Sequence, residues 1–512
     1  MPATVPTLLV SSVTSVLTDS LSGFESLVSG KVLIWLLIAT GGYLTVRTRA
    51  VQLRLLARSV ALVARSRRQR GSLSSFQAFV IGLGGRVGTG NIAGVALAVT
   101  LGGPGALLWM WVVALLGMAT SFAESTLAQV FKVRAADGIF RGGPAYYMER
   151  GLALYGRPGL ARLGRWTGLT FAAMLVFSYG LIFPMVQSNT IAVTVQSSHG
   201  VATWVTALVL MAVTAPILLA GMRAVARVTE WLVPVMALAY LAVVAVVIIV
   251  SAPRVPGVLA DVVAGALNLR AGLAGTGGGL FATFLNGVKR GLFSNEAGQG
   301  SSPNGAATAD VAHPVVQGLI QALGVFIDTI IICTATGLTI LLASPQVYTP
   351  GVEPDWAETT LVQHALADAL PGAWVVWFMS FLVITFAYSS VLGYSSFAEI
   401  NVGYLGGGSR AGIALRLAMT AATGLGAVVA LDLAWVLADV ALALMTILNL
   451  VAVLWLGRWV FAALRDYDDQ RRRGVAEPAF VGVGNPLLPR DVPGDVWTAQ
   501  RARERVQTLD EG

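Results

Sequence analysis

The sequences GGRVGTGN at residues 84–91 and SNEAGQGS at residues 294–301 decide the fold. Both lie within or beside long apolar runs, and glycine in such a run weakens a helix. Unwound backbone at membrane depth is tolerated only where protein or a watery cavity surrounds it. A matched pair of broken hydrophobic segments is the best sequence indication of a substrate and ion site in a secondary transporter. We therefore expect two discontinuous helices whose breaks form one polar site.

The composition places the chain in a lipid bilayer. Of its 512 residues, 56% are hydrophobic and only 12% are charged, whereas a soluble domain carries about 25% charged residues. A secretory signal peptide is a poor interpretation of residues 2–18, which lack a basic n-region. The single cysteine, Cys333, excludes a disulfide framework and a cysteine metal site. The histidines are scattered and form no cluster of metal ligands.

Apolar runs of about 20 residues predict eleven membrane spans in an all-α integral membrane protein. The spans cover approximately residues 32–47, 76–100, 105–128, 167–194, 202–221, 230–251, 277–310, 316–343, 373–398, 411–430 and 433–457. The first is short. The seventh is interrupted and polar in its second half.

The basic residues predict the orientation of these spans. The formal net charge is +8, but 28 of the 34 Lys and Arg residues lie in five segments that fall on one side if the spans alternate. These segments are 47–75, 131–166, 223–227, 410–416 and the tail from residue 458. This distribution predicts a cytoplasmic face rather than a nucleic-acid surface, so the N-terminus is expected outside and the C-terminus inside. The loop at residues 345–371 contains Glu353, Asp355, Glu358 and Asp368 but no basic residue, which fits an external loop.

Three regions are expected along the chain. Residues 1–72 would hold an N-terminal helix and a basic cytoplasmic segment, 73–457 the transport core, and 458–512 a polar cytoplasmic tail. Residues 48–72 alternate apolar and basic residues at helical spacing, which favours an amphipathic helix on the inner leaflet over a partner-binding helix. The tail at 466–512 is expected to be partly disordered.

A set of short motifs carries a resemblance to a known family. The motifs are SFQA at 75–78, RVGTGNIAGVA at 86–96, GGPGA at 102–106, WMW at 109–111, GMAT at 117–120, RGGPAYYM at 141–148 and FSNEAGQGS at 293–301. With them, the chain resembles the alanine or glycine:cation symporter family from about residue 73 to the last span. The resemblance implies a LeuT-type core of five-plus-five helices in an inverted repeat, preceded by one extra N-terminal helix. The two breaks then fall on the first helix of each repeat.

The first break provides donors for a carboxylate. The resemblance implies a small zwitterion, alanine or glycine, as substrate. Gly88, Thr89, Gly90 and Asn91 stand at the start of a half-helix, where backbone N–H groups and the helix dipole bind anions. The alternative is close helix packing through small residues.

Sodium requires oxygen ligands, and the resemblance implies a site between the first and eighth core helices. Carbonyls near Gly84 and Val87 would face Ser389 and Ser390 there. The alternative for each serine is a hydrogen bond to the carbonyl one turn back in its own helix.

The remaining pocket residues also follow from the resemblance. Gln187 would contact the substrate, Met185 would border the pocket and Tyr394 would cap it, although Gln187 alone is equally consistent with a helix–helix contact. The second break would add Phe293 and Ser294 to the substrate-binding set, which also includes Ser390. The family pattern usually has tryptophan near Tyr394, so the tyrosine leaves the preference between alanine and glycine open.

Charged residues in apolar surroundings are functional or paired. Glu296 would bind a cation, titrate as a proton site, or form an ion pair with Arg86, Lys289 or Arg290, and the ion pair is the favoured interpretation. Asp328 has no predicted role. Glu124 would mark the inner end of its helix or a buried pair.

The predicted function is sodium-coupled uptake of alanine or glycine by alternating access. A proton-coupled symporter, a channel-like protein and a sensor are the alternatives. The chain has no HExxH or GxSxG motif, so we expect no enzyme. We expect no cofactor apart from sodium as coupling ion, no nucleic-acid partner and a monomeric transport unit in a bacterial plasma membrane.

Overall fold

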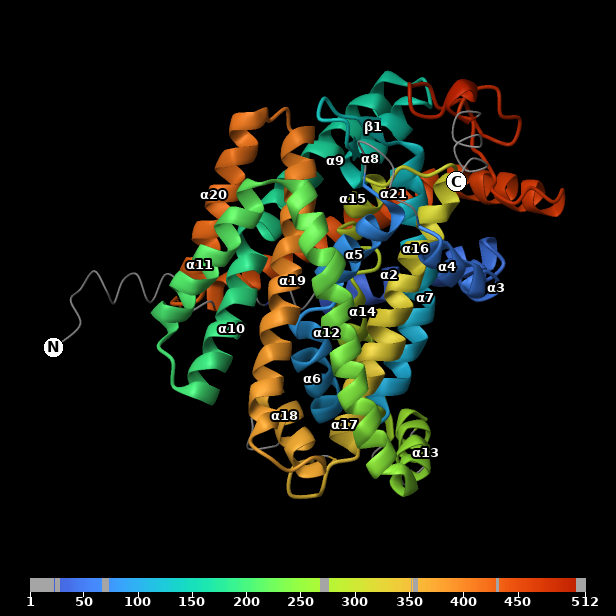
Figure 1. The fold of residues 1–512 in the computed structure, drawn as a ribbon. Coiled ribbons are helices and arrows are strands. Elements are labelled where there is room, and N and C mark those ends of the chain that lie inside the picture. The colour runs from blue at the N-terminus through green and yellow to red at the C-terminus, as the bar shows by residue number, and fades with distance from the viewer. Residues whose placement is uncertain are drawn as a thin grey trace.

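The computed structural model describes residues 28–66, 73–267, 276–350, 358–429 and 432–502, together with Gly23 and Val352. These residues form a long bundle that is almost entirely helical (Figure 1). A single two-stranded antiparallel sheet occurs within the described ranges, formed by β1 (Val133–Arg134) and β2 (Phe140–Arg141), with Val133 opposite Arg141.

The helices divide into two series in chain order, each beginning after a short preceding segment. The first part contains η1 (Val28–Leu33), α2 (Ile34–Arg47), α3 (Val51–Arg54), α4 (Leu56–Ala64), α5 (Ser75–Arg86), η2 (Thr89–Asn91), α6 (Ala93–Gly102), α7 (Ala106–Val130), α8 (Pro144–Ala153), α9 (Pro158–Phe177), η3 (Ser178–Ile182), α10 (Phe183–His199), α11 (Thr203–Leu219), α12 (Met222–Val250), η4 (Ala252–Arg254) and α13 (Val255–Ala266). The second part contains α14 (Thr276–Asn295), α15 (Ser302–Ala307), α16 (Pro314–Val325), η5 (Phe326–Cys333), α17 (Thr334–Leu341), α18 (Glu358–Ala369), α19 (Trp374–Tyr404), α20 (Ser409–Gly426) and α21 (Asp432–Arg472).

The lengths and hydropathy of these helices confirm a multi-pass membrane protein. Among the described residues, six stretches are long and apolar enough to cross a bilayer. They are Ala106–Val130, Pro158–His199, Met222–Val250, Pro314–Leu341, Trp374–Tyr404 and Trp435–Arg472. A seventh span arises if α5 and η2–α6 are joined across their 60° bend, and α2 and α11 are shorter apolar helices. The total of eleven spans stays a prediction.

The first predicted break has local causes at both of its ends. Helix α5 begins with a capping box, in which Gln77 N–H donates to Ser74 Oγ over 3.0 Å and Ser74 N–H donates to Gln77 Oε1 over 3.1 Å. It ends at Arg86, after which Val87 and Gly88 leave helical geometry with ψ of 89° and −154°. The chain then restarts as the short helix η2 and continues as α6.

The second predicted break follows α14, which ends at Asn295. Glu296, Gly298 and Gly300 then take left-handed backbone conformations, with φ of 52°, 86° and 79°. Glycine adopts this region readily, whereas a glutamate there is uncommon. The helical path resumes at α15, so both breaks predicted from the glycine patterns are present.

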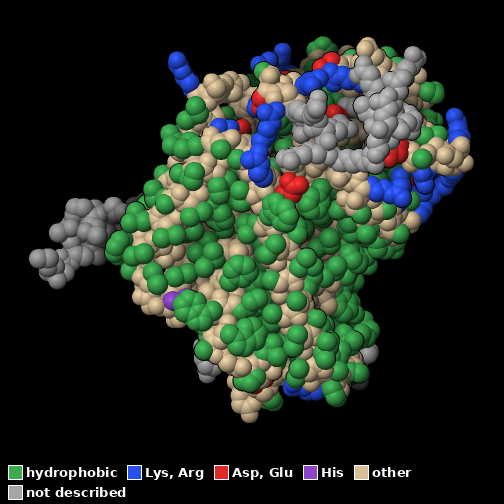
Figure 2. All heavy atoms as spheres, viewed as in Figure 1, with side chains coloured by type: hydrophobic (Ala, Val, Ile, Leu, Met, Phe, Trp, Pro, Cys, Tyr) green, Lys and Arg blue, Asp and Glu red, His purple; other side chains and the backbone are tan. Residues whose placement is uncertain are grey.

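The two ends of the bundle differ in charge. Helix α8, strand β1 and the C-terminal stretch lie at one end, and α13 and α18 lie at the other (Figure 1). Figure 2 shows Lys and Arg gathered at the first end, above a broad band of hydrophobic side chains. Large apolar residues on α12 are exposed in this band, including Trp231 (74%) and Ile249 (72%). Such an apolar surface is suited to lipid.

Two predictions outside the core need correction. The segment 48–72 is not one helix, because Arg49 and Ala50 have positive φ and α3 ends before Leu55; α4 packs on α16. The tail is not disordered over residues 473–502, since its aromatic side chains Phe480 and Trp497 are buried. Arg67, Arg68, Arg70, Glu353, Asp355 and residues 503–512 lie outside the described residues.

Candidate functional site

A small cavity lies where the two breaks meet α10, α19 and α21. Its volume is about 30 Å³. It is lined by Arg86, Gly88, Thr89, Gly90, Phe183, Val186, Gln187, Phe293, Ser294, Glu296, Gln299, Tyr394, Trp435 and Leu442. Since one water molecule needs about 10–15 Å³ by the same measure, the cavity has room for only a few heavy atoms without side-chain movement. Its size and mixed lining favour a small polar ligand.

Gln187 gives this cavity an unsatisfied acceptor. The side chain is 5% exposed, and its Oε1 has no hydrogen-bond partner within the protein. Buried side-chain oxygens are usually hydrogen-bonded, and an unpaired one requires an explanation such as a ligand. Gln187 lies on α10, which continues directly from the π-helical turn η3.

An aromatic wall closes another side of the cavity. Tyr394 of α19 packs edge-on against Tyr179, with 4.9 Å between ring centroids, and its ring is tilted against Phe183 at 5.8 Å. The structure therefore places Tyr394 at the cavity, where the sequence predicted it. Met185 lies elsewhere, because its backbone packs on Gly426 of α20, and the neighbouring Phe183 and Val186 line the cavity in its place.

Four oxygens converge between the first break and α19. Ser389 Oγ lies 3.4 Å from both Gly84 O and Val87 O, and Ser390 Oγ donates to Gly84 O over 3.1 Å. A set made only of carbonyl and hydroxyl oxygens is suited to a sodium ion. The alternative contacts are also present, since the two serine hydroxyls lie 2.9 Å and 3.2 Å from Phe386 O one turn back.

The side chain of Asn91 does not line the cavity. Its Oδ1 accepts from Gly88 N–H over 3.0 Å, and its Nδ2 donates to Asp328 Oδ1 over 2.7 Å. Asn91 therefore supports the shape of the break from behind, which differs from the predicted contact with substrate. Ser294 does line the cavity, and its hydroxyl also donates to Asp328, over 3.0 Å to Oδ2.

The predicted ion pair between Arg86 and Glu296 is wrong. Within the described part of the chain, the Arg86 guanidinium donates to Gln321 O over 3.0 Å, to Ser121 Oγ over 2.8 Å and to Ser302 Oγ. Glu296 instead accepts from Ser301 Oγ over 2.6 Å. Arg86 thus fastens the first break to three neighbouring helices through neutral groups, because its guanidinium points away from the second break's carboxylate.

Glu124 is buried without being part of an ion pair among the described residues. Its carboxylate accepts from Gly298 N–H over 3.2 Å and from Asn449 Nδ2 over 2.8 Å. Gly298 lies in the second break, so Glu124 holds unwound backbone there. This contact lies within α7 and does not mark the end of a helix.

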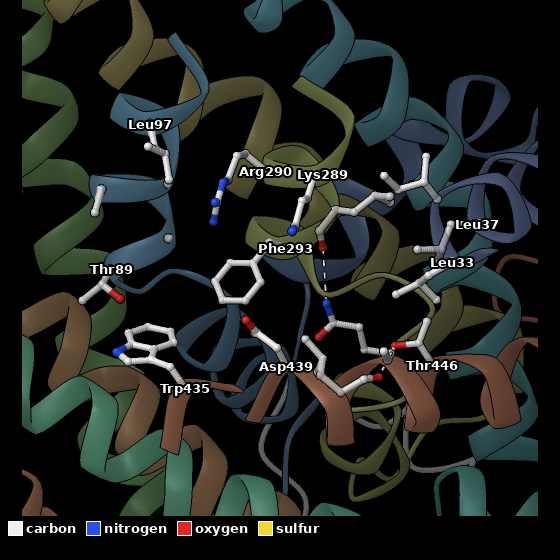
Figure 3. A pocket seen from close by; sticks show the side chains of 18 residues that line it. Leu33, Leu37, Thr89, Leu97, Lys289, Arg290, Phe293, Trp435, Asp439 and Thr446 are labelled. Carbon is white, nitrogen blue, oxygen red and sulfur yellow. Dashed lines mark hydrogen bonds between the residues drawn. The ribbon is translucent and has the colours of Figure 1, made fainter. Parts of the chain in front are cut away.

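A larger cavity adjoins the small one on the side of the outer half-helices. Its volume is about 270 Å³, and it shares Thr89, Gly90, Phe293 and Trp435 with the small cavity. Figure 3 shows the Phe293 ring between Arg290 on one side and Asp439 on the other. Lys289 and Arg290 therefore face this larger cavity. The phenyl ring of Phe293 lies at the boundary between the two spaces.

The geometry agrees with what comparison with known proteins reveals. Residues 14–481 match the model of the sodium:alanine symporter family. This chain belongs to the sodium:alanine symporter family. The match covers both breaks, the serines of α19 and most of the tail.

Named relatives in the sodium:alanine symporter family differ in the substrates that their names give. The probable sodium/glutamine symporter GlnT of Bacillus subtilis is 41% identical over 458 residues, which cover 89% of this chain and 91% of the relative. The sodium/alanine symporter AgcS of Methanococcus maripaludis is 37% identical over 454 residues, covering 88% and 96%. A putative sodium/proton-dependent alanine carrier, YrbD of Bacillus subtilis, is 36% identical over 506 residues, covering 95% and 99%. Membership therefore indicates cation-coupled amino-acid transport but does not choose the amino acid.

Several residues at the site of this symporter-family chain were not predicted. The additional lining residues are Arg86, Phe183, Val186, Glu296, Gln299, Trp435 and Leu442. Trp435 and Leu442 are seven positions apart on α21, a spacing that places both on one helix face. That spacing was visible in the sequence, but an apolar membrane helix has many such pairs, and no polar residue marked this face.

Proposed function

We propose that this protein is a sodium-coupled symporter that takes up alanine or glycine by alternating access. The observation that carries the proposal is the unpaired Oε1 of Gln187 at a small cavity between two helix breaks. A zwitterion offers an ammonium group to this oxygen. Its volume also fits the smallest amino acids better than a long side chain.

The carboxylate of the substrate would bind at the first break. Thr89 and Gly90 line the cavity and open the helix η2. The first N–H groups of a helix have no partner within that helix and attract anions. Gly88 keeps the approach open, because a Cβ there would come within 2.6 Å of Ser390 Oγ.

Sodium would bind between Gly84, Val87, Ser389 and Ser390. Its site and the substrate cavity share the first break, so an ion that orders the break raises the affinity for substrate. The substrate must then raise the affinity for sodium by the same factor. The sodium gradient and membrane potential drive uptake, and each charge moved is worth about 2.3 kcal/mol per 100 mV.

We further propose the predicted topology of eleven spans. In this interpretation η1–α2 is the extra N-terminal helix, and the two series that begin at α5 and α14 form a five-plus-five LeuT-type core. The gathered Lys and Arg residues support a cytoplasmic position for α8 and the tail, in the plasma membrane of a bacterium (Figure 2). The N-terminus is then outside.

Proton coupling is the second candidate. Three carboxylates, those of Glu124, Glu296 and Asp328, are buried around the single guanidinium of Arg86, which attracts all three. One positive charge cannot balance three negative ones, and a proton or a cation can supply the difference. The name of the relative YrbD includes a proton dependence.

Purified protein in liposomes tests the proposal. We expect labelled alanine or glycine to accumulate when an inward sodium gradient is imposed, and not with potassium in its place. Accumulation driven by a pH gradient without sodium would favour the second candidate, and no accumulation under either gradient would contradict both.

A matched pair of variants on α10 tests the role of Gln187. Gln187→Ala should weaken binding about tenfold or more, since a charge-assisted hydrogen bond is lost. Gln196→Ala is the control, because Gln196 is exposed on the same helix. Equal affinities of the two variants would contradict the assignment.

A further inference from the structure

Asp328 lies where neither the sequence motifs nor the proposed binding contacts require an acid. It is fully buried and belongs to η5, the π-helical stretch between α16 and α17. Local π-helical geometry often occurs at functional sites. Asp328 does not line the small cavity, so its contacts with neighbouring helices are the only indication of its role.

The Asp328 carboxylate joins the two breaks. Its Oδ1 accepts from Asn91 Nδ2 over 2.7 Å, on the side of the first break. Its Oδ2 accepts from Ser294 Oγ over 3.0 Å, on the side of the second break. A third donor, Thr329 Oγ at 2.7 Å, comes from the same helix as Asp328 and therefore does not join anything across the bundle.

Both links continue to groups at the cavity. Asn91 uses its Oδ1 to accept from Gly88 N–H, and Gly88 lines the cavity. Ser294 itself lines the cavity on the opposite side. A continuous chain of hydrogen bonds therefore runs from Gly88 through Asn91 and Asp328 to Ser294.

We propose that Asp328 is a positioning residue that couples the two breaks, so that both adopt their substrate-binding shape together. This inference rests on the proposed function and names how the two halves of its site are coordinated. A carboxylate suits the role because each oxygen accepts from a donor on a different broken segment. An asparagine keeps the shape but presents an NH₂ group where one of the two acceptors was.

The protein contains a natural reporter for this coupling. Cys333 is its single cysteine, is fully buried, and lies five residues after Asp328. Its Sγ is 3.3 Å from Asn91 Nδ2 and 3.2 Å from Ser294 Oγ. Loosening of either break therefore uncovers this thiol, and the rate of its alkylation measures the coupling without any substrate.

The experiment compares Asp328→Asn with Thr329→Val in purified full-length protein. We expect N-ethylmaleimide to alkylate Cys333 about tenfold faster in Asp328→Asn, the factor expected for one lost buried hydrogen bond. Thr329→Val also removes a hydrogen bond to Asp328 but none between helices, so its rate should stay within about twofold of wild type. A structural defect that only weakens η5 would accelerate both variants alike and would overturn the proposal.

A double-mutant cycle supplies a second readout. If Asp328 and Ser294 act through one link, Asp328→Asn combined with Ser294→Ala should accelerate alkylation little more than either change alone. Strictly multiplied effects, or wild-type rates in Asp328→Asn, would overturn the inference. If Asp328→Asn does not fold, Asn91→Ala and Ser294→Ala with their double variant test the same link.

Substrate measurements separate this inference from the proposed function. In wild type, alanine should slow the alkylation of Cys333 in sodium, and Asp328→Asn should lose most of this protection. Absence of any amino-acid effect in wild type would contradict the proposed function alone, because the comparison of rates without substrate still tests the coupling role of Asp328.

Discussion

Ser390 on α19 donates a hydrogen bond to the carbonyl of Gly84, which lies in the last turn of α5, over 3.1 Å. Helix α19 runs without interruption from Trp374 to Tyr404, whereas α5 ends at the first break. The contact therefore connects a continuous helix to a discontinuous one. In the proposed function, sodium binds at this connection.

Ser390→Ala should raise the sodium concentration needed for half-maximal transport about fivefold or more, because one oxygen is removed from the set that would hold the ion. Ser395→Ala is the matched control, since Ser395 is on the same helix and its hydroxyl donates to Leu392 O one turn back. The measurement is alanine uptake as a function of sodium. A sodium dependence unchanged in both variants would remove Ser390 from the ion site.

Gly88→Ala should abolish transport, since the added Cβ would come within 2.6 Å of Ser390 Oγ and 3.6 Å of Gln187 Nε2. The methyl group would occupy space between the proposed ion and substrate positions. We expect loss of alanine-dependent thermal stabilisation in detergent with the protein still folded.

Gly94→Ala provides the contrast within the same motif. A Cβ at Gly94 meets no atom within 4 Å, and the residue is inside α6. We expect retained binding and a free energy of unfolding higher by about 0.4–1 kcal/mol. Loss of function in Gly94→Ala equal to that in Gly88→Ala would show that the motif needs flexibility rather than space.

His313 predicts a loss of stability in mild acid. Burial lowers its pKa below the ordinary value of 6.5, against the opposing effect of Asp466. Its Nδ1 accepts from Val315 N–H over 3.2 Å at the start of α16, and this contact requires the neutral ring. The contribution of His313 is complete above pH 6.5 and declines as the pH falls below it, by at most about 1.4 kcal/mol per pH unit.

The check is the melting temperature of wild type and His313→Asn between pH 7.5 and 5.5. Asparagine also accepts at a helix N-terminus but does not titrate in this range. We expect wild type to lose more of its stability than the variant. Parallel pH profiles would assign the acid sensitivity to other groups.

Trp497→Ala should detach the C-terminal stretch from the bundle. The indole N–H donates to Gln129 O over 3.1 Å, and the ring packs edge-on against Phe480 at 5.3 Å beneath the ammonium of Lys132. Removal of a buried tryptophan costs about 3–5 kcal/mol. Limited proteolysis should therefore cut the tail faster, whereas Val483→Ala, at a 52% exposed position, should not change the rate.

The elements that sequence predicted well depend on local chemistry. The breaks after Arg86 and Asn295 follow from glycines that destabilise helix wherever they stand, and the serines of α19 were placed correctly beside Gly84. These features need little knowledge of which helix packs on which.

The elements that sequence did not predict depend on side-chain direction in the assembled bundle. Asn91 turns toward Asp328 instead of the cavity because η5 presents an acceptor behind it. Arg86 chooses carbonyl and hydroxyl partners on neighbouring helices, although Glu296 is nearby in the site. The ordered tail was missed because Phe480 and Trp497 are isolated aromatics in a polar stretch, and their shared contact spans 17 residues of sequence.

The left-handed backbone of Glu296 has a consequence for the evolution of the second break. Glycine at this position would relieve an unfavourable conformation, yet it would delete the carboxylate that holds Ser301. The chain thus retains an acid at the expense of local comfort, and such a compromise is typical of places where a protein must yield during its working cycle. A sequence optimised only for rigidity would contain a different residue here.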